Sequence, residues 1–418
     1  MHDFKYKKNE LFCENTRIST IAQQVGTPFY LYSYKTLIDH LTKIKKAFVE
    51  IDPLICFAVK SNGNMAVIKA LANKGAGCDI VSGGELKKAL KLKVSPKKIV
   101  FASVGKKEEA IALAIKSGIL LFNVESVPEL EVINAFAKKA DKKVQVAIRI
   151  NPDVEAATHH FITTGTLKNK FGIDLQSTRD LLRRQKAYSH IEINGLHIHI
   201  GSQIVNSTPF INAIKKVVGF VNDLRQEGIE IKYFDIGGGL GIIYKDEKPQ
   251  TAEDFAQNII PYLKKTGLKI IMEPGRFIAG NAGIFVTKVL YLKDNGFKKF
   301  LIVDGGMNDL IRPSLYNAYH DILPVKKTSS KKITVDVVGP VCESGDYFGK
   351  ERALPKMVRG DLLAVMSAGA YGYVMSSNYN ARPRVAEVMV KGNKFAIINE
   401  REKFNELIKR ERIPDFLK

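Results

Sequence analysis

Residues 53–64 read PLICFAVKSNGN, an apolar run that stops at Lys60 and continues as a short polar segment. The amphipathic stretch MAVIKALANKG (65–75) follows, and GCDIVS (77–82) begins a second apolar run. Apolar runs of this length predict buried strands, and the spacing of apolar residues between them predicts a helix. A strand, a helix and a parallel strand form one βα unit, so the number of such units decides the fold.

The same unit recurs along the chain and gives eight predicted strands. Helical stretches such as SVPELEVINAFAKKA (126–140) separate them. Eight units over about 230 residues suit a TIM-type (β/α)8 barrel in the α/β class, and an open doubly wound sheet is the alternative. The predicted strands cover residues 53–59, 78–82, 98–103, 119–124, 143–150, 193–200, 231–236 and 268–273.

The pattern changes after residue 283. Runs such as GIFVTKVLYL (283–292) and RVAEVMVKG (384–392) have strand character, with few helical stretches between them, and predict a β-rich domain. TPFYLYS (27–33) is also strand-like and is expected to join that domain. We therefore expect three segments: an N-terminal strand segment (1–34) belonging to the β-rich domain, the barrel (35–282) and the β-rich domain itself (283–418).

Composition limits the class of protein. The 418 residues are 45% hydrophobic and 26% charged, as in globular proteins with two domains. The sequence contains no long apolar run and starts without an apolar leader, so we expect no membrane span and a cytoplasmic location. The four cysteines show no metal-ligand spacing, which favours reduced thiols. The net charge of +21 comes from scattered lysines, which indicates a basic surface and anionic small ligands rather than nucleic acid.

Polar residues gather at the carboxyl ends of the predicted strands, where TIM barrels hold their active sites. A surface lysine with its stem on the core explains Lys60 alone, but it does not predict polar groups at the other strand ends. Those groups are Ser82 to Glu85, Ser103, Asn123, Arg149, Asn151, His197, His199, Gly201, Ser202, Gly237 to Gly239, and Glu273 to Arg276.

Three neighbouring strand ends have features of a phosphate site. DIGGGLG (235–241) has three consecutive glycines, Gly237, Gly238 and Gly239, which let backbone N–H groups approach an anion. EPGR (273–276) adds Gly275 and Arg276, and HIGSQ (199–203) adds the Ser202 hydroxyl. Together they predict a phosphate-binding site after the last strands of the barrel.

His197 and His199 share one face of a predicted strand. Such a pair can bind zinc, form a hydrogen-bonded core pair or stack on a flat aromatic ligand. The HH pair at 159–160 falls on a predicted loop, and no further metal-type cluster is evident, so no metal is expected. A lysine, a phosphate cradle and the glutamate Glu273 together indicate pyridoxal 5'-phosphate (PLP). The lysine would form a Schiff base, and the carboxylate would pair with the ring nitrogen and make the ring an electron sink.

Nine motifs, in the same order along residues 27–385, resemble those of the diaminopimelate decarboxylases, a family of barrel-type PLP-dependent amino-acid decarboxylases. Two departures, Ser61 after the lysine and HHF at 159–161, touch no chemical role. The motifs are FAVKSN, GCDIVSGGEL, HHFITTG with KFGI, GLHIHIGSQ, DIGGGLG, EPGR, IRPSLYNAYH, CESGD and GAYGYVMSSNYNARPR.

The resemblance implies a role for each matching residue. On the cofactor side, Lys60 is the Schiff-base lysine, His197 stacks on the ring and Glu273 pairs with its nitrogen. The phosphate region is served by Ser202, Gly237, Gly238, Gly239, Gly275, Arg276 and Tyr371. Arg276 and Tyr371 also reach substrate.

On the substrate side, the resemblance implies that Arg312 and Tyr316 hold the distal carboxylate, that Glu343 meets the distal ammonium, and that Cys342 supplies the proton after carbon dioxide leaves. Meso-diaminopimelate has an amino-acid centre at each end, so its unreactive end needs both a cation and an anion. An arginine suits the carboxylate because its planar fork binds in a bidentate manner. The family also implies a head-to-tail homodimer in which Cys342 and Glu343 complete the neighbouring site.

Other functions remain open at this point. A decarboxylase of ornithine, arginine or a carboxylated polyamine would share the fold, but an ornithine enzyme has no need of Arg312. A non-catalytic regulator on the same scaffold would be expected to lose Lys60 or Cys342, and both are present. A nucleic-acid binder is suggested by the net charge alone.

Overall fold

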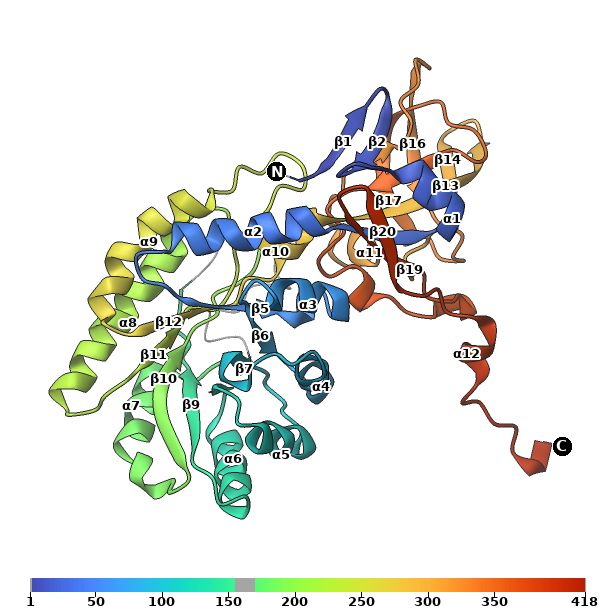
Figure 1. Ribbon diagram of the computed structural model, residues 1–418. Helices are drawn as coiled ribbons and strands as arrows, with labels where there is room; N and C mark the ends of the chain where they lie inside the picture. Colours follow the sequence, from blue (N-terminus) through green and yellow to red (C-terminus); the bar gives the residue numbers. More distant parts are fainter. Residues whose placement is uncertain (1, 155–169, 418) are drawn as a thin grey trace. The chain divides into compact units, whose positions relative to one another are not determined.

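The computed structural model describes residues 2–154 and 170–417, and the chain divides into two compact units (Figure 1). The barrel unit comprises residues 38–278. The β unit joins residues 1–37 to residues 279–418. In both, the burial of apolar strand residues supplies the core.

Eight parallel strands close into a barrel, which confirms the predicted fold and rules out the open sheet. Closure is made by the pairing of the last strand with the first, Ile271 beside Leu54. The strands follow one another around the barrel in sequence order. They are β5 (Leu54–Ala58), β6 (Gly77–Ile80), β7 (Ile99–Phe101), β8 (Leu121–Val124), β9 (Val144–Arg149), β10 (Ile191–His197), β11 (Tyr233–Asp235) and β12 (Lys269–Met272).

Helices surround the strands in the barrel unit (Figure 1). Several begin at a side-chain cap, such as Ser82 for the fourth helix and Thr251 for the ninth, because the first N–H groups of a helix need acceptors. The helices are α2 (Tyr34–Ala47), α3 (Met65–Ala72), α4 (Gly83–Lys91), α5 (Glu108–Ser117), α6 (Val127–Lys139), α7 (Leu175–Arg183), α8 (Thr208–Gln226), α9 (Ala252–Thr266) and α10 (Arg276–Ala279). In the described part of the chain, no helix combines the length and apolar character needed to cross a membrane.

The barrel strands carry two kinds of buried residue. One cluster is apolar and includes Cys56, Val100 and Ile271. Towards the carboxyl ends of the strands the buried residues are polar or charged. They are Asp79, Asn123, Arg149, His197, Asp235 and, just after β12, Glu273. Buried charges are costly unless paired, so this polar group marks a functional site.

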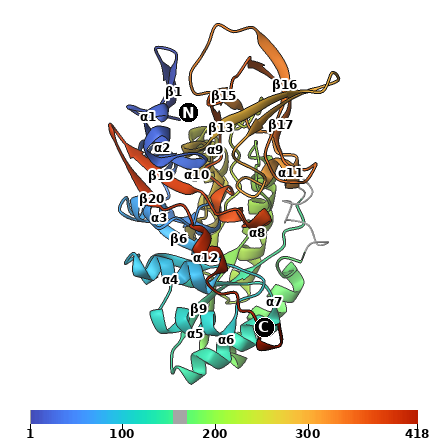
Figure 2. The same cartoon turned by 90° about the vertical axis from the view of Figure 1, so that its right-hand side faces the viewer.

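The β unit is built on a mixed sheet that includes the N-terminal strand β4, as predicted, and β4 lies between β13 and β19. Figure 2 shows β16 and β17 side by side within it. The unit's helices are α1 (Ile18–Val25), α11 (Arg312–Tyr316) and α12 (Phe404–Ile408). Its strands are β1 (Phe4–Lys7), β2 (Glu10–Cys13), β3 (Thr16–Arg17), β4 (Phe29–Ser33), β13 (Gly283–Asp294), β14 (Lys299–Val303), β15 (Ile322–Pro324), β16 (Lys332–Val338), β17 (Tyr347–Pro355), β18 (Leu362–Val365), β19 (Ala386–Lys391) and β20 (Lys394–Asn399).

Candidate active site

Lys60 lies in a single 3-10 turn (Val59–Ser61) directly after β5. Its Nζ is 2.5 Å from Oδ2 of Asp79 on the neighbouring strand β6. The Lys60 side chain is 31% exposed, whereas the Asp79 side chain is fully buried. Lys60 is therefore paired with a buried carboxylate of the barrel, which a surface lysine would not be. Sequence analysis missed Asp79, and the signal was an acidic residue inside the apolar run GCDIVS.

Buried carboxyl groups of Asp79 and Glu273 interact with this lysine, and a third, that of Asp235, hydrogen-bonds to Glu273. Burial and the Glu273 charge raise the pKa of Asp79 to about 7, although Lys60 partly opposes the shift. Burial raises the pKa of Asp235 well above its usual range, and Asp235 hydrogen-bonds to Glu273. Burial also acts to raise the pKa of Glu273, but His197, Lys60 and Asp235 outweigh it and hold that pKa below its usual range. Asp235 is thus the protonated partner and Glu273 the ionised one.

Asn123 on β8 connects the two carboxyl groups. Its Nδ2 donates to Oδ2 of Asp235 at 3.0 Å and to Oε1 of Glu273 at 3.2 Å. The backbone N–H of Gly237 donates to Asp235 Oδ1 at 2.9 Å. These bonds fix Glu273 in one orientation, as pairing with a ring nitrogen would require. The role of Asp235 was not predicted, and Asn123 was noticed only as a strand-end residue.

His197 is fully buried and His199 is partly buried, and burial lowers the pKa of both rings. Burial lowers the pKa of His197, and the neighbouring Glu273, with Oε2 at 3.6 Å from Nε2, offsets only part of this shift. Neither ring nitrogen of His197 has a hydrogen-bond partner among the described residues. Burial lowers the pKa of His199 well below its usual range, with Arg149 adding to the shift, and its Nδ1 accepts from Gly238 N at 3.3 Å. Nε2 of His197 faces the Glu273 carboxylate, and a ring-stacking role for His197 stays a prediction.

A metal site was considered at the same place. Ligand atoms of His197, Asp235 and Glu273 all lie within 4.8 Å of one another. However, the Asn123 amide already donates to both carboxyl groups, and the Lys60 ammonium supplies the nearby positive charge. This donor set favours a shared proton over a cation. The HHF segment at 159–161 lies outside the described residues.

The loops after β10, β11 and β12 carry the residues of the predicted phosphate cradle. Ile204 N donates to Gly239 O and Gly241 N donates to Ile204 O, both at 2.9 Å. A Cβ on Gly238 would lie 2.3 Å from a backbone oxygen of Glu273, so no larger residue fits there. Gly237 has φ of 68° and Gly239 of 123°, values that glycine adopts without strain.

Arg276 connects this cradle to the end of β10. Its Nη2 donates to Ser202 Oγ at 3.1 Å and its Nη1 to Tyr244 OH at 2.6 Å. Tyr244 was not predicted. The cradle combines glycine backbone, a serine hydroxyl and a guanidinium, which fits a phosphate group. With Lys60, His197 and ionised Glu273 in the same unit, the barrel residues fit PLP as a whole.

The remaining predicted residues lie in the β unit. Arg312 opens α11 and is buried, with its guanidinium carbon 5.7 Å from the ring centroid of Tyr316. Cys342 and Glu343 are exposed on the loop between β16 and β17. The loop and the start of β17 contact α11, because Ser314 Oγ donates to Gly345 O and Tyr347 OH donates to Pro313 O at 3.1 Å.

Tyr371 also belongs to the β unit, in a loop after β18. Its φ of 56° is in the left-handed region, an uncommon conformation for a tyrosine. The predicted cofactor residues thus lie in the barrel unit except for Tyr371, and the predicted substrate residues lie in the β unit except for Arg276.

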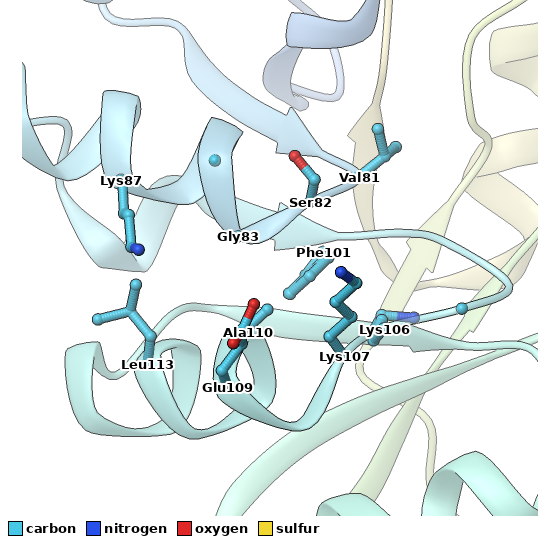
Figure 3. Close-up of a pocket in the computed structure, with 12 residues that line it drawn as sticks. Val81, Ser82, Gly83, Lys87, Phe101, Lys106, Lys107, Glu109, Ala110 and Leu113 are labelled. Carbon is cyan, nitrogen blue, oxygen red and sulfur yellow. The ribbon is translucent and has the colours of Figure 1, made fainter. Parts of the chain in front are cut away.

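One cavity of about 450 Å³ lies between α4 and α5, outside the ring of barrel strands (Figure 3). Ser82, Gly83 and Gly84 line it, although they follow a strand end and were grouped with the active-site rim. Lys106 lies at its edge, and its Nζ bonds to the backbone oxygens of Ser103 and Asn123 and to Glu129.

Comparison with known proteins agrees with this geometry. Residues 34–280 match the family model for the pyridoxal-binding domain of pyridoxal-dependent decarboxylases. The diaminopimelate decarboxylase of Aquifex aeolicus is 48% identical over 405 residues, covering 97% of this chain and 96% of that protein.

Two solved structures are similar over nearly the whole chain. Diaminopimelate decarboxylase from Helicobacter pylori, complexed with L-lysine, has a TM-score of 0.91 and 41% identity, covering 94% of this chain and 98% of that one. The enzyme from M. jannaschii, also in complex with L-lysine, has a TM-score of 0.95 and 38% identity, with all of both chains covered.

The closed barrel and the match to the pyridoxal-binding domain define a barrel-type PLP-dependent decarboxylase. The sequence identity with diaminopimelate decarboxylases extends over both units, so it narrows this class of decarboxylases to one family. The chain belongs to the diaminopimelate decarboxylase family.

Proposed function

We propose that this chain decarboxylates meso-2,6-diaminopimelate to L-lysine and carbon dioxide, the last step of lysine biosynthesis. The observation that carries the proposal is the buried Arg312 in a helix tied to the loop of Glu343. A substrate with a second amino-acid centre needs such a cation and anion at its unreactive end. Ornithine has no distal carboxylate and gives Arg312 nothing to bind.

Bound PLP would supply an electron sink for the bond that breaks. Lys60 would hold the cofactor covalently, and the cradle with Ser202 and Arg276 would hold its phosphate. Ionised Glu273, fixed by Asn123, would keep a proton on the ring nitrogen, with His197 against the ring face.

On the substrate side, Arg312 and Tyr316 would bind the distal carboxylate and Glu343 the distal ammonium. Arg276 and Tyr371 would contact both the phosphate and the substrate. Cys342 Sγ would give a proton to the substrate α-carbon once carbon dioxide has left.

The direct test is a substrate comparison. Purified protein supplied with PLP should release carbon dioxide and L-lysine from meso-diaminopimelate, and should turn over ornithine and arginine poorly. Efficient turnover of ornithine without turnover of diaminopimelate would select the alternative function.

Arg312→Lys tests the assignment of the distal carboxylate. The variant keeps the charge but loses the planar fork. We therefore expect kcat/KM for diaminopimelate to fall by a factor that corresponds to about 2–3 kcal/mol of lost transition-state binding. Turnover of L-lysine or ornithine as substrates, if measurable, should hardly change because their single carboxylate then lies at the reactive end. Equal losses on all substrates would make Arg312 a structural residue instead.

We further propose a homodimer in which Cys342 and Glu343 complete the partner's site. Lys60→Ala and Cys342→Ala homodimers should each be almost inactive. Random mixing makes about half of the dimers mixed, each with one intact composite site, so activity should recover to roughly a quarter of wild type. Size-exclusion chromatography checks the dimer. No recovery on mixing would place both residues of a site in one chain.

The domain boundaries at 34/35 and 282/283 and a cytoplasmic location are also part of the proposal. The family model ends at residue 280, close to the second boundary. Limited proteolysis and cell fractionation would test the two statements separately.

A further inference from the structure

His320 is a fully buried histidine that no part of the proposed mechanism uses. It lies eight residues after Arg312 in the chain, and its Nε2 accepts a hydrogen bond from Arg312 Nε at 3.4 Å. After α11 the chain turns back, and this turn brings His320 next to Arg312. Asn317 ends α11 with φ of 49°, and Ala318 N donates to Arg312 O at 3.3 Å.

The tautomer of His320 follows from its other nitrogen. Nδ1 is 2.8 Å from the backbone oxygen of Met366, and a carbonyl oxygen can only accept. Nδ1 therefore carries the hydrogen, and Nε2 of the neutral ring keeps the lone pair that meets Arg312.

The surrounding backbone holds the imidazole in place. Met366 N donates to Asp321 O at 2.8 Å beside the β15–β18 pairing. Arg352 Nη2 donates to His320 O at 3.1 Å, and its guanidinium lies 3.8 Å from the ring centroid of Tyr319. The ring thus has a fixed position rather than a choice of rotamers.

We propose that His320 is a positioning residue that sets substrate specificity by holding Arg312 through its Nε–H. Since Nε is engaged by His320, a carboxylate that binds Arg312 in a bidentate manner has to use the two η nitrogens. A neutral acceptor suits this role because it orients the guanidinium without cancelling its charge, whereas a carboxylate in its place would compete with the substrate. The inference rests on the proposed function, since it takes Arg312 to bind the distal carboxylate.

Two variants in the PLP-loaded enzyme test the proposal. His320→Phe keeps a ring but removes the acceptor, and we expect about a tenfold loss in kcat/KM for diaminopimelate, mainly through KM. His320→Gln retains an acceptor and should recover much of the loss. Thermal unfolding of both variants separates this effect from a failure to fold.

Inhibition by two ligands gives a readout that a merely structural role would not produce. L-Lysine keeps the carboxylate of the unreactive centre, whereas cadaverine, the diamine of the same length, lacks it. His320→Phe should weaken inhibition by L-lysine about tenfold, the scale of one lost hydrogen bond to a charged group, and leave inhibition by cadaverine unchanged. In an Arg312→Lys background the same substitution should add little, because it acts through Arg312.

The outcomes separate the two proposals. If His320→Phe weakens inhibition by L-lysine and by cadaverine equally, or if its effect and that of Arg312→Lys are fully additive, the proposed role of His320 is wrong. Normal turnover of diaminopimelate by the wild type would still support the proposed function. No turnover of diaminopimelate by wild type, or no effect of Arg312→Lys on KM, would overturn the substrate assignment and the role of His320 together.

Discussion

Replacing Lys60 by alanine is expected to lower kcat with diaminopimelate by about 10⁴-fold, the scale seen when a covalent or proton-transfer group is removed. Lys60 is the amine that the barrel places at the end of β5, 2.5 Å from a fully buried carboxylate. Without it the cofactor has no covalent attachment, although the phosphate cradle and Glu273 remain. Steady-state kinetics with excess PLP measure the loss.

A spectroscopic control identifies the attachment site. Wild type with PLP should be yellow, and borohydride should fix the cofactor to the peptide that contains Lys60. Lys91→Ala is the matched control, because Lys91 is an exposed lysine at the end of α4. It should keep both colour and activity. Recovery of the reduced cofactor on a different lysine would show that the assignment of Lys60 is wrong.

Lys106→Met is expected to destabilise the barrel unit by about 3–5 kcal/mol, because it leaves a buried carboxylate without its cation. The Lys106 side chain is fully buried and the Glu129 side chain is 9% exposed. Lys106 Nζ also bonds to Ser103 O at 2.9 Å and Asn123 O at 2.8 Å. Burial lowers the pKa of Lys106 and raises that of Glu129, which is the cost that their pairing offsets. Urea unfolding of the PLP-loaded protein measures the loss.

Two controls show whether the ion pair is the cause. Lys107 is the next residue and is exposed, so Lys107→Met should change the free energy of unfolding by less than about 0.5 kcal/mol. Lys106→Met combined with Glu129→Leu removes both charges and should be closer to wild type than the single variant. Hydrogen exchange at β7 and β8 localises the effect to the barrel. A single variant as stable as wild type would contradict the prediction.

The sequence alone predicted the barrel and its main chemical features because their signals are local. Strand and helix periodicity is repeated eight times between residues 53 and 273, and each repeat can be recognised without knowing its neighbours. The glycines at 237–239 were recognisable for a similar reason, since a run of glycines points to backbone conformations and close approaches that larger residues resist. Lys60 was singled out by its place at the end of an apolar run.

The β unit was predicted less completely. The strand at 29–33 was expected to join the C-terminal strands, but its place between β13 and β19 depends on pairing across about 250 and about 350 residues of intervening chain, respectively. The N-terminal strands β1, β2 and β3 are short, four residues or fewer, and carry too little periodicity to be recognised.

Only the tertiary structure decided which polar residues act together. Asp79, Asn123 and Asp235 come from three different strands, and their importance arises from their distances to Lys60 and Glu273. Conversely, Ser82 follows a strand end and yet lines a cavity outside the ring of strands. Which carboxyl group keeps its proton depends on burial and on neighbouring charges, and these exist only after the strands have come together.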